Sequence, residues 1–216
     1  MGVIPDNPKI YHITHLNNLP SIAEAGALYS DEECRRIKPK HAVVGMSAIK
    51  QRRLTELPVL CHRGTKVGEY VPFYFCPRSV MLYILYMGNH PDITYRDGQR
   101  PIVHLQADLQ AVVRWAENNR INWAFSDCNA GASFARFYAD YGELAILDWK
   151  AIGSTDFRPV KVKEAKQAEF LVYGSLPWSL IDEIGVIDGA MAVSVREALR
   201  DATVCPPIRV RRDWYY

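Results

Sequence analysis

Short runs of β-branched and aromatic residues recur along this chain, and such runs are typical of β-strands. Between them lie segments whose apolar residues follow a helical spacing instead. The runs that predict strands are Lys9–Thr14, Ala42–Met46, Tyr70–Cys76, Pro101–Leu105, Phe170–Val172 and Ala190–Val195.

The helical pattern is clear in the segment Leu19–Ala25, where Leu19, Ile22 and Ala23 share one face and Gly26 follows as a stop signal. Strands and helices do not alternate regularly, as they would in a doubly wound parallel sheet, so the order favours the α+β class. Further helices are predicted over Ala48–Leu57, Arg78–Met87, Leu109–Asn119 and Pro177–Ile184.

Two segments of the chain are predicted to be loops, one short and one long. Leu60–Glu69 is short and contains two glycines, whereas Ser126–Glu164 is longer, carries several glycines and is rich in aromatic residues. A loop of that length in a compact domain is usually functional or disordered. The longer segment is therefore a candidate substrate loop.

Length and composition indicate one domain that spans residues 1–216, because 49% hydrophobic residues suffice for a single sizeable core. The formal charge is only +2, so an anionic partner requires a local basic patch. The cysteines form no CxxC pair and read as reduced thiols; they are Cys34, Cys61, Cys76, Cys128 and Cys205. Without an apparent signal peptide or membrane span, a cytoplasmic location is expected.

Several common functional motifs are missing from the sequence. There is no GxGxxG after a strand and no GxxxxGK[ST], which excludes the two commonest nucleotide-binding folds. A metal-dependent nuclease would need clustered acidic residues that the chain lacks. His12 and His15 would point to opposite faces of a strand, so they do not make a convincing zinc pair.

Four segments carry candidate chemistry. The first places His12 and Thr14 near a strand end, before a polar turn, where an imidazole, a hydroxyl and backbone N–H groups can meet one ligand. A buried core histidine is the alternative. The second places Arg52 and Arg53 on a helix, either as a solvated basic face or as guanidinium groups that pair with a pyrophosphate.

The third segment, GEYVPFYFCPRSVMLYILY, is mostly core, but one of its aromatic rings could wall a flat nicotinamide. The fourth, KEAKQAEFLVYGSLPW, contains the strongest local signal. Gln167 and Glu169 are two residues apart, so on an extended backbone both side chains point to the same face. A surface ion pair is the simpler explanation for Glu169, and a catalytic carboxylate is the functional one.

In this order, these segments resemble the DarT family of DNA ADP-ribosyltransferase toxins over nearly the whole chain. VPFYFCPRSVMLY and KQAEFLV are the most specific pieces. The others that carry the resemblance are YHITHLNNLPSIAEAGAL, VGMSAIK followed by Arg52 and Arg53, PIVHLQADL and WAFSDCNAG.

The resemblance implies an ADP-ribosyltransferase fold in which two small β-sheets, surrounded by helices, frame an NAD cleft. It implies NAD as co-substrate, no metal, and a substrate loop over residues 126–169 that leads to the catalytic Glu169. Arg53, or else Arg52, is expected to assist in removing the thymine N3 proton, although a guanidinium is a poor free base. The residues expected to bind NAD are His12, Ile13, Thr14, Ser21, Tyr29, Arg53 and Tyr74.

The expected substrate is a thymine base in single-stranded DNA, with nicotinamide as the leaving group. The residues expected to contact this DNA are Trp123, Phe125, Asn129, Arg136 and Lys166. A monomeric toxin with a DarG-like macrodomain antitoxin and no membrane association is expected as well. The alternatives are a transferase of the same fold that acts on guanine, RNA or protein, and an inactive domain that binds single-stranded nucleic acid.

Overall fold

The computed structural model describes residues 2–38, 47–91 and 93–216. Its strands form an eight-stranded sheet in the order β10-β9-β4-β1-β3-β7-β5-β6 and a two-stranded ribbon of β2 and β8. The strands are β1 Lys9–His15, β2 Ala27–Tyr29, β3 Tyr70–Tyr74, β4 Ile102–Asp108, β5 Trp123–Ser126, β6 Phe137–Tyr138, β7 Glu169–Tyr173, β8 Ser175–Pro177, β9 Ile181–Val186 and β10 Ile208–Val210.

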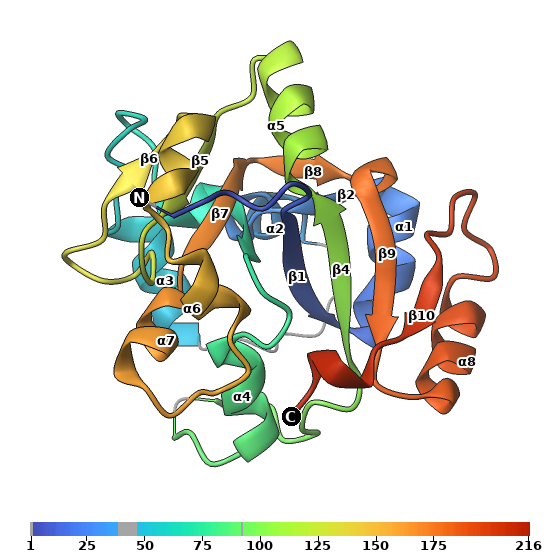
Figure 1. Cartoon of the computed structure of the whole chain (residues 1–216). Coiled ribbons are helices and arrows are strands. Elements are labelled where there is room, and N and C mark those ends of the chain that lie inside the picture. Colours follow the sequence, from blue (N-terminus) through green and yellow to red (C-terminus); the bar gives the residue numbers. More distant parts are fainter. Residues whose placement is uncertain (1, 39–46, 92) are drawn as a thin grey trace.

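The large sheet consists of two halves that meet at one point. β1 pairs with β4 along all seven of its residues, and β3 pairs with β7 from Tyr70 to Tyr74. By contrast, β1 and β3 share a single registered pair, Tyr11 with Tyr74. Figure 1 shows β1, β4 and β9 side by side, with β7 and β5 beyond them. The α+β class is confirmed, but the two sheets are of unequal size, and the split within the larger one opens the space for a site.

Helices cover the sheet and the ribbon (Figure 1). They are α1 Leu19–Ala25, α2 Asp31–Ile37, α3 Ser47–Thr55, α4 Val80–Met87, α5 Leu109–Asn118, α6 Trp149–Gly153, α7 Val160–Ala165 and α8 Gly189–Ala198, with short 3-10 turns at Leu16–Asn18, Val67–Glu69, Tyr141–Ile146, Trp178–Leu180 and Arg212–Trp214.

Local chemistry explains where these helices begin and end. Ser79 caps α4 by accepting a hydrogen bond from the Leu82 N–H at 3.2 Å, and Asp108 caps α5 by accepting one from Ala111 at 2.7 Å. α1 ends at Gly26, whose φ of 67° favours glycine. α5 then buries Leu109, Val112, Val113 and Ala116 against the core. None of the helices within the described residues is long and apolar enough to cross a membrane.

Three predictions from the sequence are wrong. Ala190–Val195 lies in helix α8, and the predicted helix Pro177–Ile184 instead covers the end of the ribbon, a 3-10 turn and the start of β9. Ser126–Glu164 is not one loop, because Leu144, Leu147, Ile152 and Val162 anchor it as packed 3-10 and α-helical turns. Only residues 127–136 form an irregular loop between β5 and β6. The predicted strand Ala42–Met46 lies outside the described residues.

Candidate active site

A cavity of about 320 Å³ opens where β1 and β3 separate. Its walls come from β1, from α1 and α2, from α3 and α4, and from the start of β7. One part of the lining is apolar and includes Ile22, Met81 and Ile84, whereas another part carries the polar side chains of β1 and of the turn that follows it. Such a mixed cavity suits a ligand with both flat rings and hydroxyl groups.

Glu169 and Arg53 form a buried ion pair in this cavity. The two guanidinium nitrogens of Arg53 donate to the two carboxylate oxygens of Glu169 at 3.1 and 2.7 Å. Their side chains are only 13% and 3% exposed, respectively. Burial disfavours the charge on Arg53, but the adjacent carboxylate of Glu169 outweighs it and raises the pKa of Arg53. The guanidinium therefore stays protonated.

The backbone holds Glu169 from several sides. The N–H of Ala130, in the loop after β5, donates to its carboxylate at 3.1 Å, and its own N–H donates to the Ser126 hydroxyl at 3.2 Å. Tyr74 is its cross-strand neighbour on β3. Burial, reinforced by the charge of Glu169, raises the pKa of Tyr74 and keeps the phenol protonated. The carboxylate thus has a fixed position at the edge between cavity and loop.

His12 presents a defined tautomer to the cavity. Its Nδ1 lies 2.8 Å from the carbonyl oxygen of Pro72, which can only accept, so Nδ1 carries the proton. Burial lowers the pKa of His12, which leaves the ring neutral and its Nε2 an acceptor. Nearby, Asn18 donates to the Thr14 hydroxyl at 3.0 Å.

Gln167 and Asn129 extend the polar edge of the cavity beside Glu169. Asn129 donates to the Gln167 side-chain oxygen at 3.2 Å, and both residues line the cavity together with Glu169. Gln167 and Glu169 therefore face the same space, although Gln167 lies in the turn after α7 and not on the extended backbone that the sequence predicted.

Seven residues selected from the sequence for NAD binding all line this cavity: His12, Ile13, Thr14, Ser21, Tyr29, Arg53 and Tyr74. The two candidate catalytic arginines do not share it. Arg52 is 48% exposed and faces Glu56 at 3.6 Å, because the next position on a helix turns by about 100°. Of the two arginines, Arg53 therefore lies in the cavity beside Glu169 and Arg52 lies outside it.

The residues selected for DNA contact are not brought together. Trp123 stacks on Phe170, and Phe125 stacks on Tyr138; the exposed fractions of Trp123 and Phe125 are 5% and 0%, so neither offers a face to a base. These two rings belong to the core because β5 is an inner strand of the sheet.

Lys166 is likewise unsuited to a DNA contact. Its side chain is buried, and its ammonium donates to the Ile152 carbonyl at 2.6 Å and lies over the ring of Phe157. Asn129 lines the cavity, and Arg136 is 74% exposed beside Asp127. Only these last two remain available to a strand that approaches Glu169.

One part of the site was missed from the sequence. Asp31 at the start of α2 and Lys50 on α3 form an ion pair at 2.7 Å, and both line the cavity. Neither lies in a local pattern that distinguishes it from an ordinary solvated charge, since their proximity depends on how α2 and α3 pack. Among the described residues, no cluster of His, Cys, Asp and Glu could hold a metal ion.

Comparison with known proteins gives one consistent result. The family profile described as "ssDNA thymidine ADP-ribosyltransferase, DarT" matches residues 11–216. A DNA ADP-ribosyl transferase from Thermus sp. (strain 2.9) is 39% identical over 215 residues, 98% of either chain. A structure of Thermus sp. 2.9 DarT in complex with ADP-ribosylated ssDNA has a TM-score of 0.88 at 37% identity, with both chains covered completely.

Two further comparisons bear on ligand and partner. The same Thermus protein in complex with NAD+ has a TM-score of 0.80 at 36% identity, covering 99% of this chain and 100% of that one. A DNA ADP-ribosyl transferase-DNA ADP-ribosyl glycohydrolase fusion protein of Thermosipho africanus is 26% identical over 212 residues, which are 94% of this chain but 48% of the fusion.

Proposed function

Because this chain belongs to the DarT family of DNA ADP-ribosyltransferases, we propose that Glu169 and Arg53 catalyse its transfer of ADP-ribose from NAD to thymidine. The chain is an NAD-dependent enzyme that ADP-ribosylates single-stranded DNA. The observation that carries the assignment of residues is the buried, bidentate Arg53–Glu169 pair at the edge of the cavity.

The cavity suits NAD by the chemistry of its walls. Apolar side chains such as Met81 and Ile84 offer contact to flat rings, and Tyr74 adds a protonated phenol beside the ion pair. The neutral His12 supplies an acceptor for a ligand hydroxyl or amide. We assign NAD binding to the seven residues of the cavity wall that the sequence selected, with Asp31 and Lys50 added.

Glu169 serves the bond-breaking step. When the bond between nicotinamide and ribose breaks, positive charge develops on the ribose, and a carboxylate fixed beside it stabilises that charge. The hydrogen bonds from Arg53 and Ala130 hold the carboxylate in place before NAD arrives. Because folding already fixes the position of the carboxylate, it does not have to reorient when the bond breaks.

Arg53 acts through its charge and not as a free base. Its raised pKa keeps the guanidinium protonated, so it cannot take up the N3 proton of thymine. A fixed cation next to the base instead stabilises the negative charge that develops as that proton leaves. Asn129 and Arg136, on the loop that contacts Glu169, are assigned to the DNA strand.

The biological setting is proposed from the substrate and the fusion relative. A toxin that modifies DNA requires a partner that reverses the mark, and the Thermosipho africanus fusion joins both activities in one chain. A DarG-like macrodomain protein is the corresponding partner here. We place the enzyme in the cytoplasm, where its DNA substrate is, and propose that it acts as a monomer.

The test is to incubate the protein with NAD and single-stranded oligonucleotides of different base content and to determine the mass of each oligonucleotide. The proposal expects one added ADP-ribose on strands that contain thymidine and none on strands without it. Addition of ADP-ribose to strands that contain only guanine, or to RNA, would show that thymidine in DNA is not the target. Absence of addition to every strand, with binding retained, would identify an inactive nucleic-acid-binding domain.

A further inference from the structure

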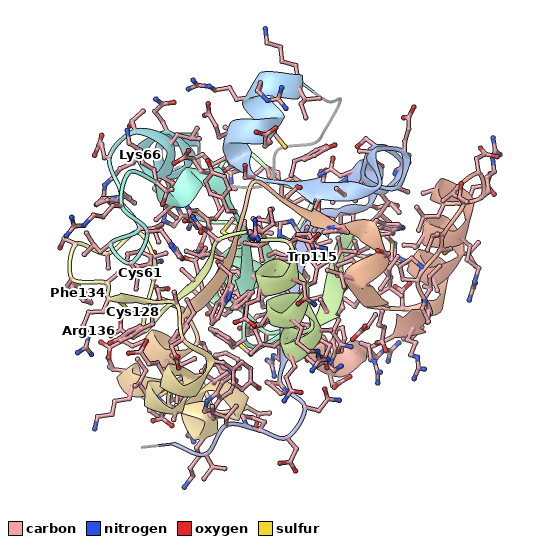
Figure 2. All side chains as sticks on the ribbon, turned by 90° about the horizontal axis from the view of Figure 1, so that it is seen from above. Cys61, Lys66, Trp115, Cys128, Phe134 and Arg136 are labelled. Carbon is pink, nitrogen blue, oxygen red and sulfur yellow. The ribbon has the colours of Figure 1, made fainter. Side chains whose placement is uncertain are left out.

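Two loops that are distant in sequence form one surface next to the ion pair. The loop of residues 60–66 follows α3, and the loop of residues 127–136 joins β5 to β6; together they are the two-loop surface. Figure 2 shows Cys61 and Lys66 of the first loop and Cys128, Phe134 and Arg136 of the second on the same side of the molecule.

The two loops are packed together and are not merely near in projection. The Nε2 of His62 donates to the Trp123 carbonyl at 2.8 Å, which ties the first loop to β5. Beneath them, Val59 and Val67 share one apolar cluster with Ala130. The two loops are therefore packed against the same part of the sheet and against each other.

The second loop is attached directly to the catalytic carboxylate. The N–H of Ala130 donates to Glu169, and Asn129 donates to Gln167. Phe134 follows Ala130 by only four residues, so its Cα lies within about 14 Å of the Ala130 Cα. A strand whose target base enters the site beside Glu169 must place its flanking nucleotides within reach of this loop.

Phe134 is exposed on a loop that is held in shape. Its ring is 77% exposed, more than any other aromatic side chain within the described residues. The loop around it is closed by Asp127, which accepts from the Arg136 backbone at 3.1 Å and from its Nε at 2.8 Å, and by the Ala135 N–H to Ala132 at 3.1 Å. A single exposed apolar ring is common on protein surfaces. This ring is distinguished by its place on a closed loop that also holds the catalytic carboxylate.

Positive charge accompanies the ring on this surface. Arg63 and Lys66 on the first loop are exposed, and Arg63 forms no ion pair with any described residue. Arg136 is paired with Asp127 but remains 74% exposed. An aromatic ring between cations is the arrangement that binds single-stranded nucleic acid, because rings stack on bases and cations contact phosphates.

We propose that Phe134 stacks on a base that flanks the target thymidine, while Arg63 contacts a backbone phosphate of the same strand. This inference rests on the proposed function and adds the two-loop surface to the substrate site. Neither residue touches the NAD cavity. Their contribution is therefore to DNA affinity and not to the transfer step.

The test for Phe134 uses a thymidine-containing oligonucleotide that the wild-type protein modifies. Because stacking on one ring is worth about 1–3 kcal/mol, Phe134→Ala should raise the KM for the oligonucleotide about 5- to 150-fold. The kcat, the KM for NAD and the Tm should stay at the wild-type values. Phe134→Trp should restore the KM and Phe134→Leu should not, and Val193→Ala, at an apolar side chain that is 62% exposed on α8, should have no effect.

Shortened substrates locate the stacked base. Removing the nucleotide that stacks should raise the KM of the wild type to the level of Phe134→Ala and leave the variant unchanged. Equal effects of every truncation on both proteins would contradict the stacking contact. Full activity of Phe134→Leu would also contradict it, because an apolar side chain without a ring would then be sufficient.

The test for Arg63 is the dependence of oligonucleotide affinity on salt. Loss of one phosphate contact to a single strand should reduce the slope of log K against log salt by about 0.7, so Arg63→Gln should show that change. Arg158→Gln is the matched control, because Arg158 is 90% exposed and outside both loops. An unchanged slope for Arg63→Gln would refute its phosphate contact.

Failure of this inference is distinguishable from failure of the proposed function. If the wild-type protein does not modify single-stranded DNA, the proposed function fails. If it does, and both Phe134→Ala and Arg63→Gln match the wild type in KM and salt slope, only the two-loop surface is wrong.

Discussion

At the scale of single residues, two adjacent arginines on α3 have opposite surroundings. Arg53 is 13% exposed and donates hydrogen bonds to both carboxylate oxygens of Glu169, whereas Arg52 is 48% exposed and lies 3.6 Å from Glu56. A bidentate contact depends on the planar fork of a guanidinium, and an ammonium group cannot reproduce it. A surface pair such as that of Arg52 contributes little.

Arg53→Lys is therefore expected to lower kcat/KM about 100- to 1,000-fold, because Glu169 loses one of the two hydrogen bonds that Arg53 donates and the cation beside the base shifts. Arg52→Lys should stay within about twofold of the wild type by the same argument. Steady-state rates of ADP-ribose transfer measure both. Similar losses in the two variants would contradict the separation of their roles.

His104 is a second residue whose surroundings fix a measurable property. It is fully buried on β4, its Nε2 donates to the Pro77 carbonyl at 2.9 Å, and its Nδ1 has no hydrogen-bond partner in the described part of the chain. Burial lowers the pKa of His104 to about 4. Between about pH 6.5 and 4, His104 therefore stays neutral in the folded protein, whereas in the unfolded chain it is protonated.

This proton balance predicts that stability falls as the pH drops from about 6.5 to 4, with about 3 kcal/mol of the loss due to His104. His104→Gln keeps a donor for the Pro77 carbonyl but does not titrate, so its free energy of unfolding should fall by about 3 kcal/mol less across that window. Denaturant unfolding at a series of pH values gives both curves. Parallel curves would exclude His104 as the source.

At the scale of elements, α8 shows how a local pattern misleads. Val193 and Val195 alternate with small residues, which reads as a strand. The structure instead buries Met191, Ala192 and Val195, at helical spacing. Asp188 decides the outcome, because it caps the helix by accepting from the Met191 N–H at 2.8 Å and pairs with Arg100.

Asp188→Ala is expected to lower the free energy of unfolding by about 1 kcal/mol, because it removes this cap, whereas Asp188→Asn should keep most of it. Asp201→Ala provides the control, since Asp201 is 91% exposed and its ion pair with Arg200 lies on the surface. Urea unfolding compares the three variants. A loss in Asp201→Ala equal to that in Asp188→Ala would show that surface charge, and not capping, matters.

The sequence predicted the strands β1, β3, β4 and β7 and the helices α1, α3, α4 and α5, because each has a strong pattern or a clear stop signal. Through the family resemblance it also selected seven residues of the cavity wall, but it missed Asp31 and Lys50. It could not show that Trp123 and Phe125 face the core, since a short strand of four apolar and small residues carries no sign of which neighbour covers it. The two-loop surface is equally a product of long-range packing.

At the scale of the whole molecule, a formal charge of +2 leaves the protein poorly equipped to open a duplex. Extracting a paired base costs a few kcal/mol, and the site consists of one cavity and the small two-loop surface beside it. The enzyme is therefore expected to modify a single strand and to be slowed at least about 100-fold when the complementary strand is annealed, since about 3 kcal/mol opposes base extraction.

Initial rates on the same strand, with and without its complement, measure this effect. A complement that anneals elsewhere and leaves the target thymidine unpaired serves as the control and should not slow the reaction. Equal rates on paired and unpaired targets would contradict the picture of a substrate site that takes an already unstacked base.

The central claim concerns Glu169, and a matched pair of variants tests it. Glu183 resembles Glu169 in being buried and in accepting two hydrogen bonds from one arginine, Arg211, at 2.6 and 2.9 Å, but it lies on β9 outside the cavity. Both Glu→Gln changes weaken a buried ion pair and are expected to lower stability. Only one of them removes the carboxylate from the site.

The decisive measurement is the rate of ADP-ribose transfer to a thymidine-containing single strand by Glu169→Gln and Glu183→Gln at saturating NAD and oligonucleotide. Loss of one charge contact in a transition state costs about 100- to 1,000-fold. Glu169→Gln should lose at least that much while it still binds NAD and DNA, and Glu183→Gln should turn over like the wild type. Wild-type turnover by Glu169→Gln, or an equal loss in both variants, would contradict the assignment of Glu169 as the catalytic carboxylate.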